Sequence, residues 1–275
     1  MFQQFSYYKD DTILFNHVKY NNPSHTNFSL HTHDICELIL LKEGDVTGII
    51  EAKTYKLQPN SIIIFRPRLV HGIRIDSNVP YNRYNIIFDE TKVANQSFQK
   101  IPKNLNIIDC NNNHLVCDLF KKLDFYHDKF TDDDFGTLVK GLIEELVFNL
   151  SITDFNHSQD PPISSNTLIT TALEFINRHY TEQLTIEDIC SELYISKRHL
   201  HHLFMEHLNI TPKKYINSKR LMKAQNMLRT GTKAYDVYFS CGFTDYATFY
   251  RNYIQKFGHP PSRESAIEIE RQIKS

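Results

Sequence analysis

The most constraining feature of this chain is an order of helix signals that occurs twice near the C-terminus. Two stretches carry it: LTIEDICSELYISKRHLHHLFMEHL, from Leu184, and AYDVYFSCGFTDYATFYRNYIQKFG, from Ala234. Each predicts a short helix, a tight turn and a longer helix. One such pattern arises easily in helical sequence. Two of them, joined by a single helix, indicate a pair of helix-turn-helix units that can straddle one face of duplex DNA.

The first unit is read from its capping signals and its apolar spacing. Thr185 is a good N-cap, and Asp188 can complete a capping box with it. Ser196 then caps the second helix of this unit. The apolar residues of that helix are spaced to point inward, which leaves five side chains outward: Lys197, Arg198, His201, His202 and Met205. This basic, donor-rich set suits the major groove, although a solvated helix face is the alternative interpretation.

The second unit follows a connecting helix. Thr211 and Pro212 begin that helix, and Gly231 is placed to terminate it. From Pro212 to about Leu228 the helix spans about 25 Å. A short helix over 234–240 is expected next, and Gly242 supplies the turn. Thr244 or Asp245 then caps a final helix that ends near Phe257 and Gly258. The outward side chains of this last helix are Tyr246, Ala247, Tyr250 and Arg251.

From Leu184 to Arg263 the chain resembles the DNA-binding domain of AraC-type (AraC/XylS family) bacterial transcription regulators. The residues that carry this resemblance are Cys241, Gly242, Phe243, Asp245, Phe249, Arg251, Tyr253, Phe257, Gly258 and Pro261. The sequence departs from the family pattern at Tyr238 and Phe239, which are bulky, and at Cys190. The bulk at Tyr238 favours the first unit as the main source of sequence specificity.

The resemblance implies double-stranded DNA and RNA polymerase as partners. Carried over by position, base contacts fall on Arg198, His201 and His202 in the first unit. In the second unit they fall on Tyr246, Ala247, Tyr250 and Arg251. Arginine can bond in bidentate fashion to guanine, and Ala247 can contact a thymine methyl group. Lys197 and Lys213 are predicted to contact phosphates.

The first part of the chain is predicted to be β. Short apolar or alternating runs recur between turn signals, over 28–30, 35–41, 46–50, 54–57, 61–66, 70–75 and 84–88. Many short strands at this spacing indicate a small barrel or jelly roll. The spacing of His31, His33, Glu37 and Gly44, with His71 further on, resembles the cupin motifs. The expected fold class is α+β multidomain: a cupin-like β-barrel with a helical hairpin, then an all-α domain with two helix-turn-helix units.

The chemistry of His31, His33, Glu37 and His71 stays open among three interpretations. They could hold a divalent metal such as Fe, Mn, Ni or Zn. They could hydrogen-bond a polar effector such as a sugar, or they could be a structural remnant. We predict an effector site, to which Arg66 and Tyr84 are added as contacts, with Arg68, Tyr81 and Arg83 as further side chains that could line or rim the pocket. No bound cofactor is expected, with a metal at the four residues as the alternative.

Two amphipathic helices are predicted between the domains, over 113–129 and 133–150. The second could cover the barrel or pair with its twin, so we expect a homodimer. The polar, proline-containing run TDFNHSQDPPISSN predicts a linker. The expected organisation is a barrel over 1–95, a connector over 96–152, a linker over 153–166, the DNA-binding domain over 167–264 and a tail over 265–275.

Composition is compatible with these assignments. The net charge of −1 hides an asymmetry, because residues 166–275 hold 15 Lys and Arg against 11 Asp and Glu. The five cysteines are odd in number and lack metal-like pairing, which indicates reduced thiols. No signal-peptide pattern and no apolar run of membrane-spanning length is found. We therefore expect a cytoplasmic protein without a membrane partner.

The predicted function is a sequence-specific DNA-binding regulator of transcription, an activator in the family's usual mode, that responds to a small molecule in the barrel and is not an enzyme. The alternative is a metal-dependent cupin enzyme, an oxygenase or isomerase, with a DNA-binding appendage. An architectural DNA binder without a ligand is a third interpretation.

Overall fold

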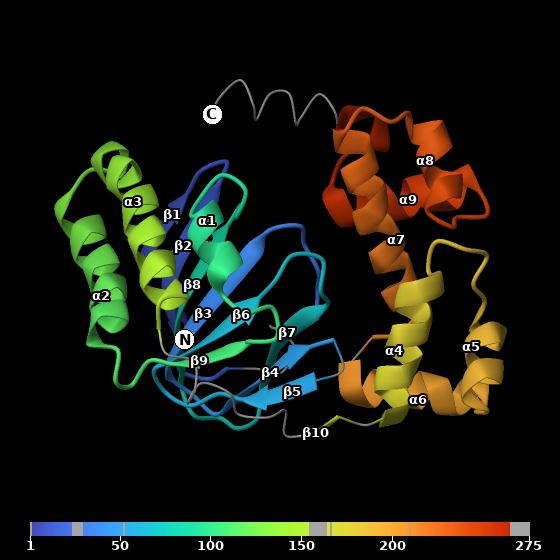
Figure 1. The fold of residues 1–275 in the computed structure, drawn as a ribbon, viewed down its shortest axis with the longest axis horizontal. Coiled ribbons are helices and arrows are strands. Elements are labelled where there is room, and N and C mark those ends of the chain that lie inside the picture. Colours follow the sequence, from blue (N-terminus) through green and yellow to red (C-terminus); the bar gives the residue numbers. More distant parts are fainter. Residues whose placement is uncertain are drawn as a thin grey trace. The chain divides into compact units, whose positions relative to one another are not determined.

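The computed structural model describes residues 2–23, 30–51, 53–153, 164–165, 167–208 and 210–264 (Figure 1). The chain forms two compact units, Met1–Ser164 and Ser165–Ser275. Most of the predicted strand over 28–30, most of the predicted linker over 153–166, and the predicted tail over 265–275 lie outside the described residues. None of the helices within the described ranges combines the length and the hydrophobicity that a membrane span requires.

The first unit contains two antiparallel sheets. The larger sheet is formed, in spatial order, by β1 (Phe2–Lys9), β2 (Ile13–Tyr20), β8 (Tyr81–Phe88), β3 (Cys36–Glu43), β6 (Ser61–Phe65) and β9 (Ile107–Asp109). The smaller sheet is formed by β10 (Ser164–Ser165), β5 (Lys53–Lys56), β4 (Val46–Ile50) and β7 (His71–Ile75). The architecture is the predicted cupin-like barrel.

Each face of the larger sheet buries a different core, because successive side chains of a strand point to opposite faces. The inner face contributes Ile39, Leu41, Ile63 and Phe65 to a cluster that also contains Val46, Ile50, Ile73 and Ile75 of the smaller sheet. The outer face contributes Leu38, Leu40, Tyr84, Ile86 and Phe88 to a second cluster. Helices α1 (Asn95–Lys100), α2 (His114–Lys129) and α3 (Asp132–Ser151) complete that second cluster.

The hairpin of α2 and α3 begins where the sequence predicts. The side chain of Asn113 accepts a hydrogen bond from the backbone N–H of Val116, and Thr131 accepts one from Asp134. Five elements of these two sheets and their covering helices were not predicted: β1, β2, β9, α1 and β10, which falls within the predicted linker. The first strand is an exposed edge strand with few buried side chains, and β9 and α1 are too short to show a period.

The second unit is all α-helical. It is formed by α4 (Thr167–His179), α5 (Ile186–Leu193), α6 (Lys197–Leu208), α7 (Pro212–Arg229), α8 (Ala234–Ser240), α9 (Tyr246–Phe257) and the 3₁₀ helix η2 (Pro261–Arg263). The core of its second half is built from residues of α7, α8 and α9, with Cys241, Phe243, Phe249 and Tyr253 fully or almost fully buried. The predicted fold class is therefore confirmed for both parts of the chain.

Candidate nucleic-acid interface and effector site

The first helix-turn-helix unit begins with the predicted capping box. The backbone N–H of Asp188 donates to Oγ1 of Thr185 at 3.1 Å, and that of Thr185 donates to Oδ2 of Asp188 at 2.8 Å. Tyr194 ends α5 with a left-handed φ of 55°. Ser196 then accepts a hydrogen bond from the backbone N–H of His199, at the start of α6. These contacts fix the turn that sets the direction of α6.

The second helix of this unit, α6, exposes the side chains predicted to read DNA. Leu200, Leu203, Phe204 and Leu208 are buried, whereas Lys197, Arg198, His201, His202 and Met205 are exposed. Lys197 forms an ion pair with Glu187, which raises the pKa of the lysine, and His202 lies 3.3 Å from a carboxylate oxygen of Glu206. Within the described residues, the side chains of Arg198 and His201 make no hydrogen bond, so their polar atoms are available to a ligand.

The second helix-turn-helix unit is positioned by a glycine at the turn between α8 and α9. Gly242 has a φ of 86°, and a Cβ atom added there would lie 2.8 Å from the carbonyl oxygen of Tyr180 and 2.9 Å from that of Glu182. Arg220 of α7 donates to both of these carbonyls, at 2.6 and 3.0 Å. The turn of the second helix-turn-helix unit therefore packs on the loop that precedes the first helix-turn-helix unit.

The final helix, α9, is capped by Asp245, which accepts a hydrogen bond from the backbone N–H of Thr248 at 2.7 Å. Ala247, Tyr250 and Arg251 are exposed, as the sequence predicts. Tyr246 is half-buried instead. Its ring packs against Tyr238 at 5.7 Å between centroids and against Phe249 at 5.8 Å. The bulky Tyr238 thus packs beside the start of α9, and Tyr246 combines packing with its predicted contact to DNA.

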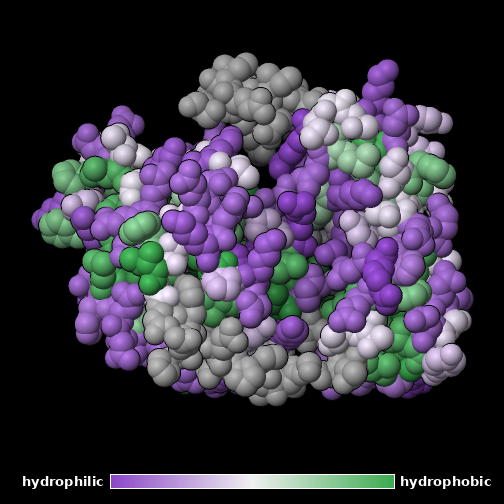
Figure 2. All heavy atoms as spheres, viewed as in Figure 1, coloured by the Kyte–Doolittle hydropathy of each residue, from purple (hydrophilic) through white to green (hydrophobic). Residues whose placement is uncertain are grey.

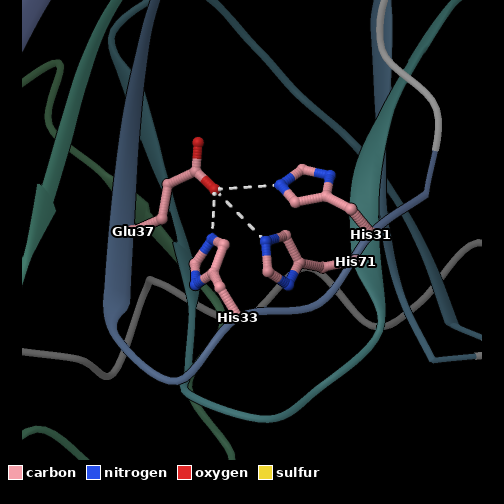
Figure 3. Close-up of side chains that lie close together, drawn as sticks. All are labelled: His31, His33, Glu37 and His71. Carbon is pink, nitrogen blue, oxygen red and sulfur yellow. Dashed lines mark hydrogen bonds and ion pairs between the residues drawn. The ribbon is translucent and has the colours of Figure 1, made fainter. Parts of the chain in front are cut away.

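In the first unit of the chain, His31, His33, Glu37 and His71 converge on one point (Figure 3). The Nε2 atoms of His33 and His71 each lie 3.2 Å from Oε2 of Glu37, and Nε2 of His31 lies 3.8 Å from the same oxygen. Backbone hydrogen bonds of 2.9 Å in both directions between His31 and His71 bring the two segments together. His71 and Glu37 are buried, and the side chain of His31 is 51% exposed.

The protonation of these histidines is constrained by their other ring nitrogens. Nδ1 of His33 lies 2.8 Å from the carbonyl oxygen of Ile35, and Nδ1 of His71 lies 2.8 Å from that of Leu69. A carbonyl oxygen accepts only, so Nδ1 must carry the proton in both rings. The Nε2 atom of a neutral ring then presents a lone pair to a carboxylate oxygen that also holds lone pairs. The cluster therefore needs a cation at its centre or positive charge on its imidazoles.

The charge on Glu37 and His71 follows from burial and from these contacts. Burial alone would raise the pKa of Glu37, but its close contacts with the three imidazoles hold that pKa well below its usual range. Burial lowers the pKa of His71, against the opposing effect of Glu37. The carboxylate is therefore ionised, and the most buried imidazole favours its neutral form.

Arg66 and Tyr84, predicted to join this site, do not lie beside the four residues. Both side chains lie on the outer face of the larger sheet, because successive side chains of a strand point to opposite faces. Arg66 directly follows the inward-facing Phe65, and Tyr84 comes three residues after the inward-facing Tyr81. Tyr84 donates to Oδ2 of Asp124 at 2.7 Å and stacks on His17. Arg66 donates to the carbonyl oxygen of Pro102 at 2.8 Å. These two side chains connect the sheet to the segments that cover it, so the structure contradicts the prediction that they join His31, His33, Glu37 and His71 in one site.

Comparison with known protein families decides the identity of this architecture. Residues 18–105 match the AraC-like ligand binding domain, and residues 189–265 match a helix-turn-helix domain. The chain belongs to the AraC family of transcription regulators. It is a DNA-binding regulator of transcription with an N-terminal ligand-binding domain.

Related AraC-family proteins align with most of this regulator. The Bacillus subtilis HTH-type transcriptional regulator YbfI is 24% identical over 225 residues, which cover 79% of this chain and 80% of YbfI. The activator RhaS of Escherichia fergusonii is 22% identical over 247 residues, 85% of this chain and 86% of RhaS. The lactose operon transcription activator of Staphylococcus xylosus is 32% identical over 87 residues, 31% of each chain.

We predict that Gly242→Ala destabilises the AraC-type domain more than Gly231→Ala does. Both glycines have left-handed φ values, of 86° and 88°, but a Cβ at Gly231 would meet no atom within 4 Å. Gly231→Ala is expected to cost about 1 kcal/mol of unfolding free energy from backbone conformation alone. Gly242→Ala adds overpacking against two backbone carbonyls, for a total of about 3 kcal/mol. Chemical denaturation measures both values, and equal losses would contradict the role assigned to the contact.

Proposed function

We propose that this AraC-family regulator binds its operator through α6 and α9, and that a small molecule bound in the barrel controls that binding. The observation that carries the proposal is the matching exposure of the two helices, each at the same place in a helix-turn-helix unit. Arg198, His201 and His202 would contact bases in one major-groove segment. Tyr246, Ala247, Tyr250 and Arg251 would do so in the next, with Lys197 and Lys213 on phosphates.

Activation is the proposed direction of control, through contact with RNA polymerase. Support comes from relatives that are named activators, RhaS and the lactose operon activator. We further propose that the barrel is sensory rather than catalytic, since the related proteins are transcription regulators. A regulator that binds chromosomal DNA would act in the cytoplasm.

We predict that Arg198→Ala and Lys213→Ala weaken operator binding in different ways. Loss of a guanidinium that contacts a base should cost about 1–3 kcal/mol of binding free energy and relax preference at one base pair. Loss of a phosphate contact should weaken binding to all sequences alike and reduce the salt slope by about 1. Fluorescence anisotropy on a set of single-base operator variants, at several salt concentrations, measures both effects. An Arg198→Ala protein with unchanged base preference would refute the assignment.

We also propose a homodimer that forms through α3. Leu138, Phe148 and Ile152 of this region are exposed, the last two by 47% and 61%. They follow a helical spacing that also includes Gly141, where an added Cβ would meet nothing within 4 Å. Figure 2 shows hydrophobic atoms over the helical hairpin, on the left of the view. A row of large apolar side chains on one helix suits the self-complementary contact of a two-fold dimer.

We predict that the wild-type protein is a dimer at micromolar concentration and that Phe148→Glu makes it a monomer. A charge at the centre of an apolar helix contact is left desolvated or opposed by its symmetry mate. Light scattering measures the mass of each protein. Phe239→Glu is the control, because Phe239 is a similarly exposed phenylalanine of α8 in the other unit. A monomeric wild type, or a dimeric Phe148→Glu protein, would contradict the proposal.

The convergence of three imidazoles on one carboxylate favours a second proposal, a divalent metal at His31, His33, Glu37 and His71. One ligand atom from each residue lies within 4.8 Å of all the others. A metal ion accepts the lone pairs that the Nδ1–H bonds force onto Nε2, and it neutralises Glu37. Three nitrogens and one oxygen suit Zn²⁺, Mn²⁺, Fe²⁺ or Ni²⁺.

We predict one equivalent of metal per chain after incubation with Zn²⁺ or Mn²⁺ and removal of excess. Elemental analysis should show its loss in His71→Ala and in Glu37→Gln, but not in His114→Ala, which removes an exposed histidine of α2. Metal at 100 times its dissociation constant should stabilise the wild type by about 2.7 kcal/mol. Substoichiometric metal and an unchanged melting temperature would instead favour imidazoles that carry positive charge.

A further inference from the structure

The inner face of the larger sheet carries three polar side chains that belong to none of the clusters described above. Strands β2 and β8 pair so that Asn16 lies opposite Asn85 and Val18 lies opposite Arg83. Strands β8 and β3 pair so that Asn85 lies opposite Ile39 and Arg83 lies opposite Leu41. Ile39 and Leu41 belong to the core between the two sheets. Asn16, Arg83 and Asn85 therefore form one group inside the barrel.

These three side chains have polar atoms that no hydrogen bond satisfies within the described residues. Asn85 is 5% exposed, and its Oδ1 atom has no partner. The same is true of Oδ1 of Asn16 and of Nε and Nη1 of Arg83. Buried polar groups in proteins are almost always hydrogen-bonded, so a cluster of exceptions on adjacent strands requires an explanation. A ligand that is bound there supplies one.

Arg220 is a buried arginine with a structural role, and its contacts can be compared with those of Arg83. Its guanidinium donates to the carbonyl oxygens of Tyr180 and Glu182. The side chain of Arg83 makes no hydrogen bond within the described part of the chain, and its guanidinium lies 5.9 Å from the ring centroid of Tyr81. No carboxylate oxygen among the described residues lies within 4 Å of it. The half-buried side chain of Arg83 thus has no carboxylate counterion among the described residues, and its Nε and Nη1 atoms are shielded from solvent.

The electrostatics of the barrel connect this group to the histidine cluster. Burial raises the pKa of Tyr81, which Arg83 opposes and Glu37 reinforces. Glu37 and Arg83 therefore act on the same buried hydroxyl from the same face of the sheet. The inner face presents a cationic donor beside two amides, and an amide side chain can donate as well as accept. The Nε and Nη1 atoms of Arg83 can donate to an oxyanion, and the Oδ1 atoms of Asn16 and Asn85 can accept from hydroxyl groups next to it.

We propose that the effector is a small hydroxylated anion, whose carboxylate or phosphate group pairs with Arg83 and whose hydroxyl groups bond to Asn16 and Asn85. This inference rests on the proposed function, since it names the class of molecule that the barrel senses. It replaces the neutral sugar of the sequence-based expectation with a charged one. The guanidinium gains the acceptors that the fold does not provide, and the two amides fix the orientation of the bound molecule.

The test compares matched anionic and neutral probes on the full chain. Isothermal titration at constant ionic strength would compare gluconate with its neutral counterpart sorbitol, and glucose 6-phosphate with its neutral counterpart glucose. Inorganic phosphate would be titrated alone. At least one hydroxylated anion should bind tenfold more tightly than its neutral counterpart. Gluconate as the tighter ligand identifies a carboxylate effector, and glucose 6-phosphate identifies a phosphate ester.

Arg83→Met, which replaces the guanidinium by an unbranched apolar side chain and so removes its charge, should reduce the binding of that anion at least tenfold. Arg83→Lys should retain part of it. Arg74→Met is the matched control, because Arg74 is an exposed arginine of β7 that pairs with Asp76, and it should bind as the wild type does. Circular dichroism and the melting temperature show that each variant is folded.

The inference is overturned if no anion binds more tightly than its neutral counterpart, or if Arg83→Met retains the anion preference of the wild type. Operator binding by the same preparations separates this failure from that of the proposed function. A wild-type chain that binds its operator but shows no anion preference refutes the effector class alone. A wild-type chain that shows no salt-sensitive operator preference refutes the proposed function itself.

Discussion

The alternation of side chains along the larger sheet is the constraint on which the first unit depends. Because β2, β8 and β3 are paired in register, one set of positions packs beneath α1, α2 and α3 and the other set faces the smaller sheet. A slip of β8 by one residue would turn Arg83 toward these helices and Tyr84 toward the smaller sheet. The burial of Leu38, Ile86 and Phe88 on one face therefore fixes which side chains a ligand can meet on the other.

In the second unit, local capping has the corresponding role. The helices of each recognition unit are short, and α5 and α8 have fewer than nine residues each, so packing and end contacts rather than length stabilise them. Thr185 with Asp188 and Asp245 with Thr248 satisfy backbone groups at the two places where the chain changes direction. Most outward side chains of α6 and α9 take no part in the core of this unit, the half-buried Tyr246 excepted, and they are the side chains proposed to contact DNA.

The sequence allowed most of the second unit to be predicted, because its signals are local. Caps, apolar spacing and left-handed glycines lie within a few residues of one another, and the helix α8 was predicted to the residue. The histidine cluster was found for the same reason, since three of its members lie within seven residues. Asn16 was missed because β2 was not recognised as a strand. The sequence did not predict that Arg83 points to the inner face and Tyr84 to the outer face of the sheet. That assignment requires the register between strands that are distant in the sequence.

The support that Gly242 receives from the loop before α5 has a consequence for how operators are read. Arg220 holds the carbonyls of that loop, and the turn between α8 and α9 packs against them, so the second helix-turn-helix unit is anchored on the segment that leads into the first. One base pair inserted between the two contacted segments of a duplex rotates them by about 34° relative to each other. A flexible joint between the two units would absorb that rotation, whereas this packed contact resists it. We therefore expect operator binding to depend on the number of base pairs between the two contacted segments as well as on their bases.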